Sequence, residues 1–264
     1  MFTSHDAKKV ILAHDWEDGK AISVVQAPYR FEAVVQCTSL PRPAFAQAEF
    51  ANGLKSYFCW TKLLRPDGTW IKDGAVIVPV LADGRILTVI EQRPAQWQFG
   101  EKNPNHMLMV NKGELDIRKF GQHSSPELPG GARDPQDKTV KLAGLRELWE
   151  ETRIPPQDAT LYACTRPWYA QGSDLALQEY VSVVFLSQSS FESYVKNDGG
   201  LKVLALTPDE VERNIRRGVI CSGQAGVLPW FFAQQVFRAR QDPVYQQELL
   251  KDGYMTIEEV QIKP

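Results

Sequence analysis

The sequence has few of the features that would assign it to a function class at once. Its cysteines form no C-x-x-C pair, so neither a zinc site nor a redox motif is indicated, and scattered cysteines of this kind favour reduced, buried thiols. The 30 Lys and Arg do not exceed the 32 Asp and Glu, which argues against a general nucleic-acid binder. No apolar run reaches the roughly 18 residues of a membrane span, and no signal peptide is evident at the start. We therefore expect a cytoplasmic protein without a nucleic-acid or membrane partner.

What is present is ordinary for a folded protein. The 264 residues are 43% hydrophobic and 23% charged, which suits one large domain or a domain with a smaller appendage. Short apolar and aromatic runs before residue 70 predict a β-rich extension over 1–70. The remaining 71–264 are predicted to form the main domain, with an insertion at about 94–126.

Local patterns predict alternating strands and helices. Asp83-Gly84 between two apolar runs is typical of a hairpin joining strands at 74–81 and 85–93. Thr207 with Glu210 forms a capping-box pattern for a helix at 208–217. The other expected strands are 33–37, 56–64, 160–166 and 178–187, and the other expected helices are 138–152, 223–239 and 243–251. This mixture indicates an α/β or α+β fold.

The insertion is polar and loop-like apart from the short apolar segment 106–110. A connection of this length inside a compact domain is often functional. The sequence leaves open whether it is a lid, a substrate loop or an insertion of no consequence.

Three glutamates stand close together in R-E-L-W-E-E-T-R-I (146–154). On a helix, Glu147, Glu150 and Glu151 are spaced i, i+3 and i+4, so their carboxylates share one face. Such a face is either solvated or holds a cation, and clustered hard oxygen donors suit Mg²⁺ or Mn²⁺. Arg146 lies four residues before Glu150 and is placed to pair with it.

Charged patterns on helices are usually solvated faces, and R-E-x-x-E-E alone favours that interpretation. The upstream Leu128-Pro129-Gly130-Gly131 changes the balance, because such a turn lets backbone approach a ligand or metal. The turn, the polar loop and the carboxylate-bearing helix together indicate a metal or ligand site more specifically than any one of them alone.

This composite resembles the Nudix box, G-x5-E-x7-R-E-U-x-E-E-x-G-U with U aliphatic. Gly131 resembles its first glycine, and 146–154 its R-E-U-x-E-E-x-x-U section. The glutamate position holds Lys138, one residue too far along, and Asp137 beside it is placed to substitute. The late glycine is replaced by Arg153, with Pro155-Pro156 as the expected helix stop.

The flanking segments V-I-E-Q-R-P (89–94), P-W-Y-A-Q-G-S-D (167–174) and 202–225 resemble those of ADP-ribose pyrophosphatases and related nucleotide-sugar hydrolases. The resemblance implies a Nudix-type α/β/α sandwich with a mixed sheet. It also implies metal-dependent hydrolysis of a pyrophosphate in a nucleoside diphosphate linked to another group, giving a nucleoside monophosphate and a sugar phosphate. A homodimer through residues 30–70 is a further implication.

The resemblance also assigns roles to residues. Glu147, Glu150, Glu151 and the Gly130 carbonyl are expected to hold Mg²⁺ or Mn²⁺, with Gly130 and Gly131 also at the substrate. A further loop acid is expected in 187–200, either Glu192 or Asp198. Arg93 is expected either to grip a phosphate or to form a surface salt bridge.

Two other functions stay open. One is a hydrolase of dinucleotides, and the other a Nudix-fold binding or regulatory protein without turnover. Lys138 and Arg153 favour the second, whereas the intact R-E-x-x-E-E argues against it.

Overall fold

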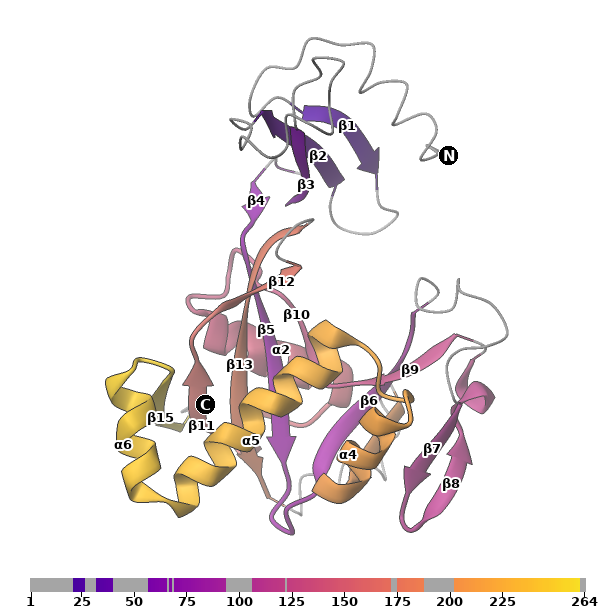
Figure 1. Ribbon diagram of the computed structural model, residues 1–264, viewed down its shortest axis with the longest axis vertical. Coiled ribbons are helices and arrows are strands. Elements are labelled where there is room, and N and C mark those ends of the chain that lie inside the picture. The colour runs from indigo at the N-terminus through magenta and orange to yellow at the C-terminus, as the bar shows by residue number, and fades with distance from the viewer. Residues whose placement is uncertain are drawn as a thin grey trace, which may run out of the picture. The chain divides into compact units, whose positions relative to one another are not determined.

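The computed structural model describes residues 21–26, 32–39, 57–65, 67, 69–93, 106–121, 123–171, 175–187 and 202–261. The chain divides into two compact units (Figure 1). The smaller comprises Met1–Lys72 with Tyr169–Leu177, and the larger Asp73–Trp168 with Gln178–Pro264.

The smaller unit contains an antiparallel sheet. In it β1 (Ala21–Gln26) pairs with β2 (Glu32–Ser39), β2 with β3 (Tyr57–Leu64), and the end of β3 with β4 (Trp70–Ile71). The strands predicted near 33–37 and 56–64 are thus confirmed.

The larger unit is built on a mixed sheet. Its central pair is parallel: β5 (Asp73–Val80) runs beside β13 (Leu175–Leu186), with Val76 opposite Val181. Beyond β13 lie β11 (Ala159–Thr165) and β15 (Met255–Gln261), both antiparallel to their neighbours. On its other edge β5 pairs with the short β10 (Gly130–Ala132).

The strands of the predicted hairpin after β5 pair only next to their turn and then separate. The strands β5 and β6 (Ile86–Gln92) share the register pair Val80–Ile86 next to the turn. Beyond it, β6 pairs with β9 (Ser124–Glu127) and β14 (Lys202–Leu206). Because β9 pairs with β6 and β10 pairs with β5, the Pro-Gly-Gly turn that joins β9 to β10 lies beside β5.

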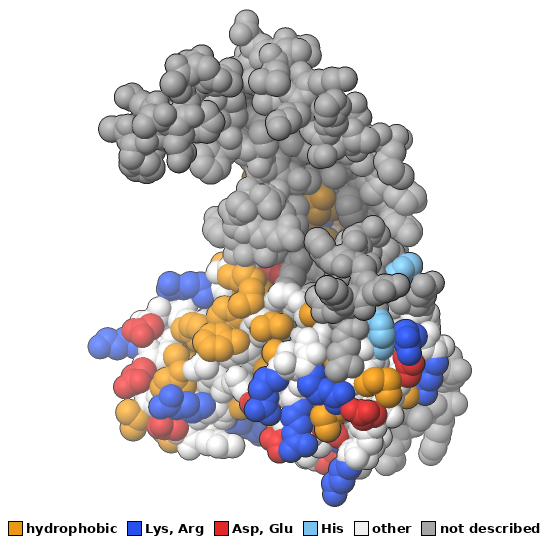
Figure 2. Space-filling model, turned by 45° about the vertical axis from the view of Figure 1, so that its right-hand side comes forward, with side chains coloured by type: hydrophobic (Ala, Val, Ile, Leu, Met, Phe, Trp, Pro, Cys, Tyr) orange, Lys and Arg blue, Asp and Glu red, His pale blue; other side chains and the backbone are white. Residues whose placement is uncertain are grey.

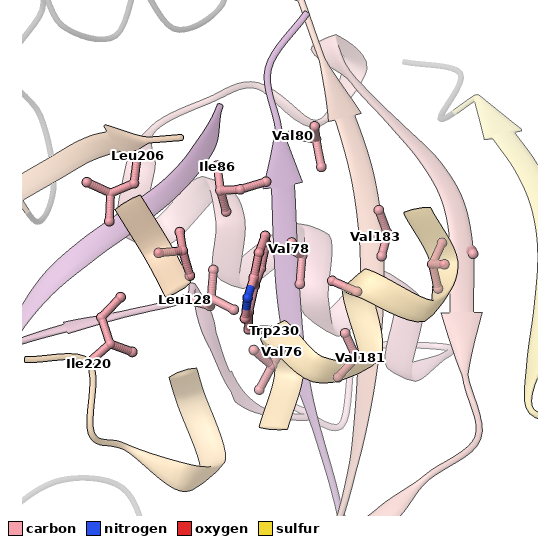
Figure 3. Packing of buried hydrophobic residues seen from close by; sticks show 14 of the residues in the cluster. Val76, Val78, Val80, Ile86, Leu128, Val181, Val183, Leu206, Ile220 and Trp230 are labelled. Carbon is pink, nitrogen blue, oxygen red and sulfur yellow. The ribbon is translucent and has the colours of Figure 1, made fainter. Parts of the chain in front are cut away.

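Helices cover both faces of this sheet, as the alternation along β5 requires. Val76, Val78 and Val80 belong to one core cluster, which contains Trp230, Ala233 and Val236 of α5 (Leu228–Gln241). Figure 3 shows Trp230 beside Val76 and Val78 in this cluster. The intervening Ile77 belongs to a second cluster with Leu145 and Leu148 of α2 (Val140–Thr152). The α/β/α sandwich predicted from the sequence is therefore confirmed.

The remaining helices agree with their sequence signals. The helix α4 (Pro208–Arg216) has the complete capping box of Thr207 and Glu210. Ser222 caps a short π-helix, Gly223–Val227, that leads into α5, and α6 (Pro243–Lys251) follows. On the face in Figure 2, basic and acidic side chains are interspersed over the described part, in keeping with the near-zero net charge of −2.

Much of the expected loop 94–126 is regular structure, so that prediction was wrong for its second part. Residues 94–105 lie outside the described residues. The strands β7 (Met107–Val110) and β8 (Gly113–Asp116) form a hairpin, whose turn residues Asn111 and Lys112 have φ of 51° and 60°. A 3₁₀ turn, Ile117–Phe120, leads on toward β9.

A buried asparagine fixes this hairpin to the main domain. Asn214 of α4 is fully buried, accepts a hydrogen bond from the Met109 N–H at 2.8 Å and donates to its carbonyl at 2.9 Å. Glu210 accepts from the Lys112 N–H at 3.1 Å, and Arg217 pairs with Glu114 at 2.7 Å. The described part of the insertion is therefore docked on α4 at several points.

Of the free cysteines in the described side chains, Cys164 is buried as expected and Cys221 is exposed.

Candidate functional site

The site is organised by the position of α2 on the sheet. Thr139 begins the helix by accepting a hydrogen bond from the Leu142 N–H at 3.2 Å. Gly144 faces β5 so closely that a Cβ there would lie 2.9 Å from Ile77 Cδ1. This close approach brings the carboxylate face of α2 up to β10, where the Pro-Gly-Gly turn continues.

Arg146 is the centre of a hydrogen-bond network. Its Nη1 donates to Glu147 Oε1 at 2.8 Å and to Glu150 Oε2 at 3.1 Å, and its Nη2 donates to the Ala132 carbonyl at 2.9 Å. Burial disfavours its charge, but Asp137 and Glu147 outweigh burial and raise the pKa of Arg146. The guanidinium therefore stays charged and holds two of the three glutamates, as well as the β10 backbone.

Asp137, and not Lys138, occupies the acidic position of the box. The Asp137 side chain is buried, and its Oδ2 accepts from Arg146 Nε at 3.1 Å and Nη2 at 3.0 Å. Lys138 is exposed, and its carbonyl accepts from Arg133 at 3.1 Å. The additional loop residue thus moves the acid one position further from Arg146 in the sequence, and a carboxylate still contacts the arginine of the box pattern.

Gly131 lies directly against Glu147. A Cβ on Gly131 would be 2.5 Å from Glu147 Oε1, so only glycine fits here without displacing the carboxylate. Burial raises the pKa of Glu147, Arg146 lowers it, and the charges of Glu150 and Asp134 raise it further.

Glu151 is the most perturbed carboxylate of the site. Burial, followed by the negative charges of Glu91 and Glu147, raises its pKa to about 9. A backbone hydrogen bond from Gly130 opposes this rise. Its Oε2 is buried and has no hydrogen-bond partner among the described residues. An unsatisfied buried carboxylate oxygen beside other carboxylates is costly unless a proton or a cation compensates it.

Two further acids join the site that the sequence analysis did not single out. Glu91 and Glu127 lie on the paired strands β6 and β9, and both form ion pairs with Arg93. The Arg93–Glu127 separation is 2.8 Å, and the Glu127 side chain is only 2% exposed. Burial raises the pKa of Glu91; Arg93 opposes the rise and Glu127 adds to it. The sequence signal for Glu91 was an acid near the end of the otherwise apolar strand β6, whereas Glu127, in the strand Ser-Ser-Pro-Glu, has no such signal.

Arg153 adopts the backbone conformation that the missing glycine would take. It is the C-terminal cap of α2 with φ 61° and ψ 14°, and its N–H donates to the Trp149 carbonyl at 2.8 Å. A left-handed residue at this position is the usual end of a helix, normally supplied by glycine. The helix therefore ends at Arg153, two residues before the two prolines that were expected to stop it.

Other expected residues are not brought into this arrangement. Glu192 and Asp198 lie outside the described residues. Within the described ranges, no group of three His, Cys, Asp or Glu side chains is arranged as a ready metal site. No described helix is long and apolar enough to cross a membrane.

The family model of the NUDIX domain matches residues 73–231. A solved structure described as the crystal structure of an ADP compounds hydrolase is similar at 11% identity, covering 86% of this chain and 98% of that one, with a TM-score of 0.46. No curated protein matches significantly.

Proposed function

Because the chain belongs to the Nudix family, we propose that it is a divalent-metal-dependent hydrolase of a nucleoside diphosphate linked to another group. ADP-ribose or a nucleotide sugar is the proposed substrate class, and the products are a nucleoside monophosphate and a sugar phosphate. The preference within the family rests on the flanking segments 89–94, 167–174 and 202–225, which resemble those of ADP-ribose pyrophosphatases.

One observation carries the proposal: the buried Oε2 of Glu151 lies among like charges and has no hydrogen-bond partner in the part of the chain that the structure describes. A structural carboxylate in this position would be expected to have an arginine or several N–H donors. Here the arginine of the helix is directed to Glu147 and Glu150 instead. A site that concentrates negative charge and directs its buried arginine to the other two glutamates is suited to a cation that arrives with the substrate.

The donor set fits Mg²⁺ or Mn²⁺. Glu147 and Glu150 each use one oxygen for Arg146, so within the described part of the chain each has a second oxygen available. With Glu151 and the Gly130 carbonyl they would supply hard oxygen ligands, which both ions prefer. When bound, such ions neutralise the phosphates and lower the pKa of a coordinated water.

The chain's own residues prepare the site for that chemistry. Arg146 holds Glu147 and Glu150 at a fixed separation, and its charge prevents their mutual repulsion from splaying them. Gly131 leaves room for Glu147 at the β10 backbone. Arg93, whose charge interacts with Glu151, is proposed to bind a substrate phosphate from the side of β6. Glu192 is proposed as the additional loop acid, with Asp198 as its alternative.

A substrate panel tests the proposal. The purified protein is incubated with Mg²⁺ or Mn²⁺ and ADP-ribose, UDP-glucose, GDP-mannose, NADH or diadenosine polyphosphates, and nucleoside monophosphate is measured. Metal-dependent release from ADP-ribose or a nucleotide sugar is expected. Release from the dinucleotides alone would move the substrate class to the alternative hydrolase. Binding without turnover of any member would refute the enzyme and leave the binding protein. The homodimer through residues 30–70 stays a prediction, which the mass in gel filtration tests.

A further inference from the structure

Arg93 is held by one edge of its guanidinium. Its Nε and Nη2 both donate to Glu127 Oε2, at 3.0 and 2.8 Å, and Nη2 also pairs with Glu91. Within the described part of the chain, Nη1 donates to no other group. Because the guanidinium is planar and rigid, fixing the Nε–Nη2 edge also fixes the direction of Nη1.

The carboxylate that holds Arg93 is itself immobile. Glu127 is 2% exposed, whereas the Arg93 side chain is 43% exposed. Behind Glu127 lies a small cavity lined mainly by apolar side chains, among them Leu128, Val211 and Trp230. The arrangement therefore has a buried anchor at one end and an accessible cation at the other.

Arg93 lies near the carboxylates of the site, because it pairs with Glu91 and directly follows β6, whose partner β9 leads into the Pro-Gly-Gly turn. The charges of Arg93 and Glu91 both act on Glu151, so the three groups lie near one another. Glu127 comes from β9 and is followed directly by the Leu128-Pro129-Gly130-Gly131 turn. The same short segment thus supplies both the anchor of Arg93 and the glycines that contact Glu147 and Glu151.

We infer that Glu127 is a positioning residue that aims the Arg93 guanidinium at the diphosphate of a bound substrate, an inference that rests on the proposed function. Glu127 does not touch the substrate. It restricts Arg93 to the orientation in which the two protons of Nη1 are presented to phosphate oxygens. A clamp that merely joins β6 to β9 would stabilise the fold without affecting how Arg93 binds.

A double-mutant cycle on binding separates the two roles. The affinity of the full chain for α,β-methylene-ADP, which resists hydrolysis, is measured by calorimetry with Mg²⁺ for the wild type, Arg93→Ala, Glu127→Gln and the double variant. Arg93→Ala is expected to weaken binding about tenfold or more. Glu127→Gln is expected to weaken it roughly threefold to tenfold, as for partners in one network. The double variant should match Arg93→Ala within about twofold, because no guanidinium then remains to be oriented.

Three outcomes would each overturn the inference. In the first, the double variant loses affinity by the product of the two single losses. In the others, Glu127→Gln binds with unchanged affinity, or the wild type does not bind. Glu114→Gln is the matched control, because it breaks the Arg217–Glu114 ion pair at 2.7 Å on the hairpin and should leave the affinity unchanged. If Glu127→Gln fails to fold, Glu127→Asp retains the charge and should show an intermediate affinity. A wild-type affinity there would equally overturn the inference.

Turnover distinguishes this inference from the proposed function. On whichever substrate the panel identifies, Glu127→Gln should raise KM more than it lowers kcat, since Arg93 is expected to hold the diphosphate before and during reaction. A wild type that hydrolyses nothing refutes the proposed function, and the binding cycle still decides the role of Glu127. If the wild type hydrolyses its substrate and the two substitutions have additive effects on the free energy of binding, only the role of Glu127 is refuted.

Discussion

Replacing Glu151 by glutamine should stabilise the metal-free protein while it abolishes activity. The glutamine has nearly the same shape and carries no charge. The folded chain holds this carboxyl with a pKa of about 9, against 4.5 as the ordinary value. Between these two values the folded state keeps a proton that the unfolded state has lost, so the free energy of unfolding falls as pH rises.

The size of the effect follows from that difference. Each pH unit changes the free energy of unfolding by about 1.36 kcal/mol, so the 2.5 units from 4.5 to pH 7 amount to about 3 kcal/mol. Glu151→Gln removes this pH-dependent cost, because its amide is neutral in both states. Stability should therefore be similar in the two proteins below pH 4.5, and the variant's advantage should grow up to about pH 9.

Urea unfolding in EDTA at pH 5, 6, 7 and 8 measures the slope, and the hydrolysis assay with Mg²⁺ measures activity. Glu150→Gln is the matched control, because its side chain is 41% exposed and its pair with Arg146 should contribute at most about 1 kcal/mol. Added Mg²⁺ should stabilise the wild type and have much less effect on Glu151→Gln. Equal stability of wild type and Glu151→Gln at pH 8 would show that Glu151 is not a desolvated carboxyl. Turnover that survives nearly intact would remove Glu151 from the metal face.

Three substitutions away from the metal face give separate predictions. The free energy of unfolding of Arg153→Gly should be about 1 kcal/mol higher than that of Arg153→Ala, because both variants lose the guanidinium but only glycine adopts φ 61° without strain. Equal stabilities in thermal unfolding would contradict this. Asn214→Ala should cost about 2 kcal/mol or more in urea unfolding, since both polar groups of the Met109 backbone lose their buried partner, and a neutral result would show that the hairpin is not anchored there. Asp137→Asn should cost about 2 kcal/mol and lower activity, whereas Lys138→Ala should stay within about 0.5 kcal/mol; the reverse order would return the acidic role to position 138.

Local sequence signals predicted the helices α2, α4, α5 and α6 and the strands β5, β6, β11 and β13 of the larger unit, but not the strands β7, β8, β9, β10, β14 and β15. The capping box at Thr207, the Asp83-Gly84 turn and the spacing of the three glutamates depend on residues close together in the chain, and the structure has each of them. The acid that replaces the box glutamate was also identifiable, because Asp137 is adjacent to Lys138, which stands at the glutamate position. These features need no knowledge of how distant segments meet.

The remaining features depend on distant segments. The hairpin 107–116 was missed because its anchor, Asn214, lies 105 residues from Met109. Glu91 and Glu127 were missed because only strand pairing brings an acid of β6 next to one of β9. Arg153 was judged from charge and the following prolines, whereas the decisive property was a backbone dihedral angle. The roles of Glu147, Glu150, Glu151, Arg93, Gly130 and Gly131 remain predictions.

Gly144 has a consequence for how this protein would tolerate change. A glycine inside a helix costs about 1 kcal/mol relative to alanine, so an isolated α2 would be improved by Gly144→Ala. In the folded chain that methyl group would meet Ile77 and push the helix outward from the sheet. The contact between Gly144 and Ile77 therefore sets the distance between α2 and β5, and with it the position of the carboxylates, from within the core. Substitutions at 144 or 77 are therefore expected to shift the carboxylates of α2 relative to β10 without altering any residue of the site itself.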